Sequence, residues 1–245
     1  MDIRLILCTL MLLTLLVCAL AGGGRYNVIQ ALNADPNIDL IEIEEFQVLP
    51  NICHGKECPK YTDVEDVKLP SGVKLRDYPD MNWISSSRYD AVDNSCLEGS
   101  EDMVNYYQQL YNYFKGVNTM GLLMERTVPI RVIGQIDPDT GDVKYCHLMF
   151  FIPGMYSVNA PAPLSVGIFV GHNFEKRCYV VSINGNYSWK RAMKIHKALK
   201  NFLGRKKVDD VVQSELILDI YSGYGVPNSK KYSEVLLCMK VDEFY

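Results

Sequence analysis

The chain has few of the residues that common catalytic and metal sites need. Only four histidines occur among 245 residues, and His54 alone lies near a cysteine pair. The sequence contains no Gly-x-Ser-x-Gly elbow, phosphate-binding glycine loop, His-Glu-x-x-His motif or dinucleotide fingerprint. A cysteine and a histidine brought together only by folding remain possible as a catalytic pair. The absences therefore favour a binding protein over an enzyme of a common class.

A strong excess of charge is also absent. The chain has 25 basic and 29 acidic residues and a net charge of -4, which gives no indication of a nucleic-acid partner. The charges are uneven, however: residues 22–70 hold nine acids and four bases, whereas residues 189–207 hold eight bases and no acid. The basic run is either a solvated helix face, which we favour, or a docking surface for an anionic partner.

Long apolar runs are missing everywhere except at the N-terminus. There, Arg4 precedes an apolar run from Leu5 to Leu20, and Ala19-Leu20-Ala21 is followed by three glycines. A basic start, a short apolar core and a small-x-small site are typical of a signal peptide, here residues 1–21. The alternative is an uncleaved anchor. We therefore expect a secreted, extracellular protein with no stable membrane insertion after cleavage.

Cysteines are sufficient for a disulfide framework. Six remain after removal of the signal, and an even number in a secreted chain favours disulfides, but six cysteines allow 15 pairings and the sequence does not choose among them. Cys53 and Cys58 flank a glycine-containing loop and could pair with each other. An alternative for Cys146, Cys178 and Cys238 is that they are small apolar residues buried in strands. The candidates are Cys53, Cys58, Cys96, Cys146, Cys178 and Cys238.

A single glycosylation sequon is present, Asn186-Tyr187-Ser188. It stands just before a segment with helical periodicity, where the surface should be accessible. In a secreted protein this predicts a glycan on Asn186.

The pattern divides the mature chain into an acidic leader, residues 22–57, and a folded domain, residues 58–245. Within the domain, runs rich in β-branched and aromatic residues alternate with turn signals and predict strands. These runs are 61–67, 73–78, 81–86, 130–136, 143–152, 166–170, 178–183, 216–221 and 235–241.

Two segments have helical periodicity. In the first, about residues 98–115, Met103, Val104, Tyr107, Leu110, Tyr111 and Phe114 fall on one side, and Gly116 is a natural stop. The second runs from about 188 to 203, with Gly204 expected as its C-cap. Its buried stripe contains Ala192, Ile195, Leu199, Phe202 and Leu203, and its other face is basic.

Strands, a helix and strands therefore occur twice in succession. The two helix-ending glycines lie 88 residues apart, so internal duplication is the economical interpretation. We predict an α+β fold: a distorted antiparallel β-barrel of about eight or nine strands, built from two βαββ-like repeats and flanked by two long helices.

Several short motifs follow one another in a fixed order from the Cys53 loop to the C-terminus. They are Cys53-His54-Gly55-Lys56-Glu57-Cys58-Pro59, Val73-Lys74-Leu75-Arg76-Asp77-Tyr78, Trp83-Ile84-Ser85-Ser86, Tyr113-Phe114-Lys115-Gly116-Val117-Asn118, Thr127-Val128-Pro129-Ile130, Phe151-Ile152-Pro153 and Tyr221-Ser222-Gly223-Tyr224. No single motif is diagnostic, but their order resembles the SOUL haem-binding protein family over roughly residues 58–245. That family has the barrel architecture predicted above.

The resemblance implies a shallow hydrophobic cleft beside the first helix that holds haem, another tetrapyrrole or a similar flat apolar ligand. Tyr106 and Tyr113 would lie half exposed at its edge, although they could instead shield the seam between helix and barrel. The residues implied as its lining are Met103, Tyr106, Tyr107, Leu110 and Tyr113.

The chain departs from the family pattern next to this cleft. Many relatives have a methionine directly before Thr-x-Pro, whereas here Arg126 precedes Thr127 and Met124 lies two positions earlier. The arginine could pair with a haem propionate, or it could mean that the ancestral ligand is no longer bound. His196 lies in the apolar stripe of the second helix and is the best candidate for a metal-coordinating axial ligand, although a buried, hydrogen-bonded histidine is the more common case.

The sequence thus predicts a secreted haem or tetrapyrrole carrier or scavenger. One alternative is a small-molecule hydrolase on the same duplicated fold, which would need a carboxylate of raised pKa beside a tyrosine. Glu125 is the only acid we nominate, and Arg126 beside it should lower that pKa. A third possibility is an interaction module that uses the basic helix. The oligomeric state is left open.

Overall fold

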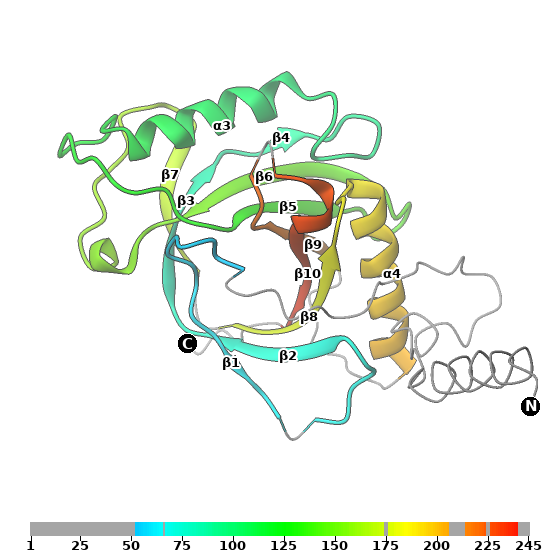
Figure 1. The fold of residues 1–245 in the computed structure, drawn as a ribbon. Helices are drawn as coiled ribbons and strands as arrows, with labels where there is room; N and C mark the ends of the chain where they lie inside the picture. The colour runs from blue at the N-terminus through cyan, green and yellow to red at the C-terminus, as the bar shows by residue number, and fades with distance from the viewer. Residues whose placement is uncertain (1–51, 66, 174–175, 206–213, 224–225, 240–245) are drawn as a thin grey trace, which may run out of the picture.

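The computed structural model describes residues 52–65, 67–173, 176–205, 214–223 and 226–239. The expected signal peptide and residues 22–51 of the expected leader lie outside this part. The predicted α+β class is confirmed, since two long helices flank one curled antiparallel sheet (Figure 1). The helices are α3 (Glu101–Phe114) and α4 (Trp189–Arg205). The strands are β1 (Thr62–Asp63), β2 (Val73–Tyr78), β3 (Met81–Ser86), β4 (Tyr89–Asp90), β5 (Ile130–Ile136), β6 (Val143–Phe151), β7 (Ile168–Asn173), β8 (Lys176–Asn184), β9 (Glu215–Ile220) and β10 (Tyr232–Cys238).

The order of strands in the sheet reflects an internal two-fold symmetry. Strands follow the path β1-β2-β8-β10-β9-β5-β6-β3-β7, with β4 paired to β6 beside it. The first half, β2-β3-α3-β5-β6, corresponds element by element to the second, β7-β8-α4-β9-β10, and exchanging the halves leaves the order from β2 to β7 unchanged. The duplication is therefore present with one more strand at the start of each repeat than we expected, and β5 and β9 pair where the halves meet.

A bent two-stranded ribbon gives the sheet its curl. Tyr78 pairs with Lys176 at the end of the β2–β8 ladder, and Met81 pairs with Asn173 at the start of the β3–β7 ladder. Tyr78 and Met81 are three residues apart, as are Asn173 and Lys176, so the two ladders share one register across the bend. Because β8 also pairs with β10 and β3 with β6, the ribbon leads each side of the sheet back toward the other and produces the barrel-like shape.

The two helices lie on the same side of the sheet but on different halves. α3 packs on β3, β6 and β7, and α4 packs on β9 and β10. The side chain of Ser100 caps α3 by accepting from Met103 N, and Gly116 follows at φ 97°, as glycine after a helix commonly does. Gly204 does not cap α4, contrary to our prediction, because the helix continues through it to Arg205.

The sheet face turned away from the helices carries buried charges. Arg131 donates to Asp219 at 2.7 and 2.8 Å, and the two residues are opposite each other on β5 and β9. Arg76 donates to both carboxylate oxygens of Glu234, at 2.9 and 3.0 Å. All four are at most 4% exposed. Removing one partner of such a pair would leave an uncompensated buried charge. Arg131–Asp219 therefore favours one register of β5 on β9, and Arg76–Glu234 ties β2 to β10 across the strand between them, β8.

All six candidate cysteines form disulfides. Cys53 pairs with Cys58, Cys96 with Cys146, and Cys178 with Cys238. Cys146, Cys178 and Cys238 are indeed buried in strands, but as half-cystines and not as free thiols. The bridge between β8 and β10 joins residues that are direct neighbours in the ladder.

We predict that the two long-range disulfides contribute more stability than the local one. They span 50 and 60 residues, whereas Cys53–Cys58 spans 5. The loop-entropy relation gives about 4 kcal/mol for each long loop and about 2 kcal/mol for the short one. Urea unfolding of the three paired Cys→Ala variants measures this, and equal losses for all three would contradict the prediction.

Candidate functional site

Two of the residues expected to line the cleft belong to the core instead. Leu110 and Tyr113 are fully buried, and the Tyr113 hydroxyl donates to the carbonyl of Pro161 at 2.8 Å. Tyr113 is therefore not half exposed, contrary to our expectation. Val104, which we placed in the buried stripe, is 62% exposed. The buried side of α3 is thus centred on Leu110 and Tyr113, rotated from the predicted stripe.

Three tyrosines of α3, Tyr106, Tyr107 and Tyr111, are half-buried, whereas Phe114 belongs to the core. The ring of Tyr106 lies 6.0 Å from that of Tyr89 and against Gly167, where a Cβ would meet it at 3.1 Å. Tyr107 packs edge-on against Phe150 at 5.5 Å. Both rings therefore shield the seam and also present an edge to solvent.

Arg126 is held against α3 by two tyrosines. Its Nη2 donates to the hydroxyl of Tyr107 at 3.1 Å, and its Cζ lies 5.2 Å from the ring centroid of Tyr111. Its Nε is buried and has no hydrogen-bond partner among the described residues. Met124 is buried two positions earlier, where its backbone N–H donates to the carbonyl of Phe114 at 3.0 Å.

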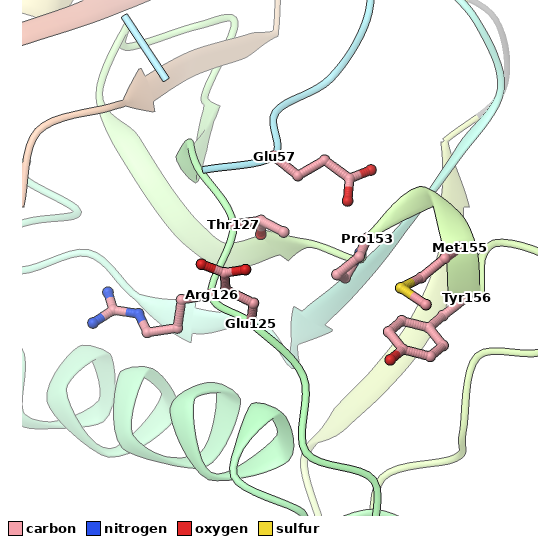
Figure 2. A pocket seen from close by; sticks show the side chains of 7 residues that line it. All are labelled: Glu57, Glu125, Arg126, Thr127, Pro153, Met155 and Tyr156. Carbon is pink, nitrogen blue, oxygen red and sulfur yellow. The ribbon is translucent and has the colours of Figure 1, made fainter. Parts of the chain in front are cut away.

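A small pocket opens beside this arginine, on the side away from α3 (Figure 2). Its volume is about 180 Å³. Glu57 and Glu125 contribute two carboxylates, and Glu57 Oε1 also accepts from the backbone N–H of Gly154 at 2.7 Å. The guanidinium of Arg126 points out of the pocket toward the helix (Figure 2). The lining residues are Glu57, Glu125, Arg126, Thr127, Pro153, Met155 and Tyr156.

His196 lies on α4, on the other half of the sheet, and the structure does not bring it to the α3 residues. It is 3% exposed. Burial, with a smaller contribution from Lys200, lowers the pKa of His196 from 6.5 to about 4. It is therefore a neutral core residue at physiological pH, and this placement gives no support to an axial role. No cluster of three or more potential metal ligands exists within the described ranges.

The outer face of α4 carries the expected lysines. Lys190, Lys194 and Lys197 are exposed. Ala192, Ile195, Leu199 and Leu203 are buried beneath them, as predicted. The basic run is thus the solvent side of an amphipathic helix.

Sequence reasoning missed a buried carboxylate surrounded by phenols. Glu234 is fully buried and accepts from the hydroxyls of Tyr221 at 3.0 Å and Tyr232 at 2.5 Å. Burial and then the Glu234 carboxylate raise the pKa of both phenols, which therefore stay protonated as donors. Because Arg76 binds both oxygens of Glu234, the group is a satisfied structural network. The only sequence signal was a set of polar residues at inward positions of strands.

Comparison with known families identifies the family of the chain. The sequence matches the model of the SOUL heme-binding protein family over residues 56–238. The chain belongs to the SOUL family. No curated protein matches it.

Solved structures similar to this SOUL protein are distant. A hydrolase encoded by lin2189 from Listeria innocua is 12% identical, covering 68% of this chain and 90% of its own, with a TM-score of 0.47. The EcmrR C-terminal domain is 10% identical, covering 69% and 98%, with a TM-score of 0.45. SAV2435, solved bound to tetraphenylphosphonium, is 11% identical, covering 69% and 93%, with a TM-score of 0.41. At such distances no function is transferred from them.

The described residues fit haem as a surface ligand and not as an enclosed one. Pockets that enclose a ligand usually measure about 300–1,000 Å³, so the 180 Å³ pocket is too small for the macrocycle. Arg126, with its buried unpartnered Nε, and the rings of Tyr107 and Tyr111 fit a flat molecule with anionic edge groups. Within the part of the chain that the structure describes, no helix is long and apolar enough to cross a membrane.

We predict that His196 makes the protein less stable in acid. Its pKa is about 4 when folded against 6.5 as the reference value, so between these values the unfolded chain binds a proton that the folded chain does not. Stability is unaffected above about pH 6.5 and falls as the pH drops toward 4, by about 3 kcal/mol in total.

Urea unfolding at pH 7 and pH 4.5 tests this with His196→Gln. The variant should lose part of the acid dependence of the wild type. His172→Gln, which removes an exposed histidine, is the matched control. Equal acid dependence in the wild type and His196→Gln would contradict the prediction.

Proposed function

We propose that this SOUL protein is a secreted carrier or scavenger that binds haem, or a similar flat apolar ligand with an anionic edge, at the surface of α3 beside Arg126. The single observation that carries the proposal is the state of Arg126. Two tyrosines orient its guanidinium, and its buried Nε has no hydrogen-bond partner among the residues that the structure describes. An anionic ligand group at the surface would pair with the positive charge of this guanidinium through a charge-assisted hydrogen bond from its terminal nitrogens.

The surroundings of Arg126 supply the rest of the recognition. Tyr107 and Tyr111 offer aromatic surface on which a macrocycle can stack. On the other side of the arginine, Glu57 and Glu125 line the small pocket and would repel propionates. A tetrapyrrole would therefore direct its propionates to the α3 side of Arg126 and leave much of its ring exposed, which favours exchangeable binding.

Arginine at this position explains the departure from the usual methionine of the family motif as an exchange of partners. A thioether could contact iron or the ring face, whereas a guanidinium contacts the anionic edge. Met103 and Tyr106, further along the seam, would contact the apolar rim of the ligand. In this proposal Leu110, Tyr113 and Met124 support the surface from below, and His196 takes no part.

A haemin titration followed by the Soret band tests the proposal. Arg126→Gln should weaken saturable one-to-one binding about tenfold, because a hydrogen bond to a charged group is lost. Arg88→Gln is the matched control, since Arg88 also stacks on a tyrosine, Tyr145, at 4.6 Å, but away from the site. If both variants bind as the wild type does, or if the wild type binds no better than an unrelated acidic protein, the proposal is wrong.

Three disulfides support the secreted part of the proposal, because disulfides persist in oxidising compartments. Asn186 is exposed, so its side chain is accessible to glycosylation. On expression in secretory cells, the protein should be found in the culture medium, begin at Gly22 and lose mass on treatment with a glycosidase. Asn186→Gln should remove that loss, and an intracellular or unprocessed product would contradict secretion.

The hydrolase alternative has less support. Glu125 is exposed, so no enclosed site surrounds it of the kind in which a catalytic acid or base would meet a substrate. Glu234 has neighbouring tyrosines, but Arg76 neutralises it. Neither carboxylate is arranged as an acid or base for a bound substrate.

A further inference from the structure

Within the described part of the chain, one edge of the sheet lacks the covering strand that its symmetry-related edge has. β1 lies on the outer edge of β2. β7 is the counterpart of β2 in the second half, and among the described residues it pairs with β3 alone. In the residues that the structure describes, β7 is therefore open where β2 is covered.

The hydrogen bonds around β3 identify which groups of β7 point outward. Ser87 N donates to Gly167 O at 2.6 Å, continuing the β3–β7 ladder, and Ile152 N donates to Asn82 O on the opposite side of β3. Bonding directions alternate along a strand. The backbone N–H and C=O groups of Ile168, Val170 and His172 therefore face away from β3.

This edge has none of the usual protection against pairing. Natural proteins blunt open edges with charges, proline or bulges. Residues 152–173 contain no aspartate, glutamate, lysine or arginine, and β7 contains no proline. By contrast, β1 is two residues long, contains Asp63, and follows Pro59 and Lys60.

Apolar side chains surround the open edge. Phe169 within β7 is 48% exposed, and the loop before it exposes Leu164 and Val166. That loop is joined to the loop after α3 by hydrogen bonds between Thr119 and Ala162, and both loops project on the β7 side of the molecule (Figure 1). The exposed large hydrophobic residues of the two loops and β7 are Val117, Met120, Leu123, Met155, Val158, Leu164, Val166 and Phe169.

The open backbone decides between kinds of partner. Hydrocarbon cannot satisfy the outward N–H and C=O groups of β7, so a lipid surface does not fit this edge. Another strand satisfies them directly. An uncharged patch also meets a copy of itself without like-charge repulsion, and antiparallel pairing about a two-fold axis is self-complementary.

We propose that β7 pairs antiparallel with β7 of a second copy of this chain, forming a symmetric dimer with a sheet continuous across the interface. The two β7 strands overlap most when the two-fold axis passes beside Val170. The backbone of Ile168 in each copy then hydrogen-bonds to the backbone of His172 in the other copy. In this register Phe169 lies opposite Gly171 of the partner subunit, which leaves room for its ring. The dimer is independent of the proposed ligand site.

Sedimentation velocity of the signal-cleaved protein over a range of concentrations tests this. The wild type should be a dimer that dissociates on dilution. Val170→Pro removes an N–H group that faces outward and leaves the hydrogen bonds to β3 in place. An edge strand tolerates proline at such a position. Because the loss occurs twice in the dimer, the dissociation constant should rise roughly 30-fold.

Phe169→Glu and Phe169→Lys provide a second, independent arm. Each alone should be monomeric, since like charges would lie diagonally across the new strand pair, whereas an equimolar mixture should form a heterodimer. Val67→Glu, at an exposed valine elsewhere, is the matched control and should stay dimeric. A wild type that is monomeric at every concentration, or a dimer that survives the Val170 and Phe169 changes, overturns the proposal. Thermal unfolding of each variant separates lost association from lost folding.

Discussion

The pairing of β5 with β9 is the constraint on which the rest of the structure depends. It joins the two halves of the chain along the axis of their internal symmetry, and the Arg131–Asp219 ion pair lies directly across it. The guanidinium of Arg131 also lies 4.3 Å from the ring of Trp83 on β3. Because these charges are buried, a shifted register would separate them in an apolar interior at a cost of several kcal/mol. The position of every other strand follows from this seam and the bent ribbon of β2–β3 and β7–β8.

This architecture separates the two helices and therefore the features that looked alike in the sequence. α3 packs on β3, β6 and β7, whereas α4 packs on β9 and β10, so each helix covers its own half of the sheet. The ligand surface that we propose is therefore built from α3 and the segment around Arg126 that precedes β5. In that proposal the surface offers a guanidinium and aromatic rings but no histidine, which would favour recognition of the shape and charge of a tetrapyrrole over strong iron coordination.

A strand outside the two repeats explains why one edge of the sheet differs from the other. An exact repeat would treat β2 and β7 alike, yet the segment before the first repeat supplies β1 and covers only β2. Before β7, by contrast, the chain forms a loop that is hydrogen-bonded to the loop after α3. The proposed ligand surface on α3 and the open edge of β7 are thus neighbours, because α3 packs on β7.

The sequence by itself determined the class of fold, the two helices and the family. Period-two and period-3.6 patterns are local and survive without knowledge of contacts, which is why most strands were predicted within a few residues, although β4, with two residues, was too short to give a signal. Only the tertiary structure decided the disulfide pairing, the burial of Tyr113, the separation of His196 from α3 and the Glu234 network, and it revealed the open β7 edge. Each of these depends on which residues far apart in the chain are brought together. Helical periodicity limits which side chains face inward but not which of the half-apolar ones, such as Val104 and Tyr113, the sheet finally covers.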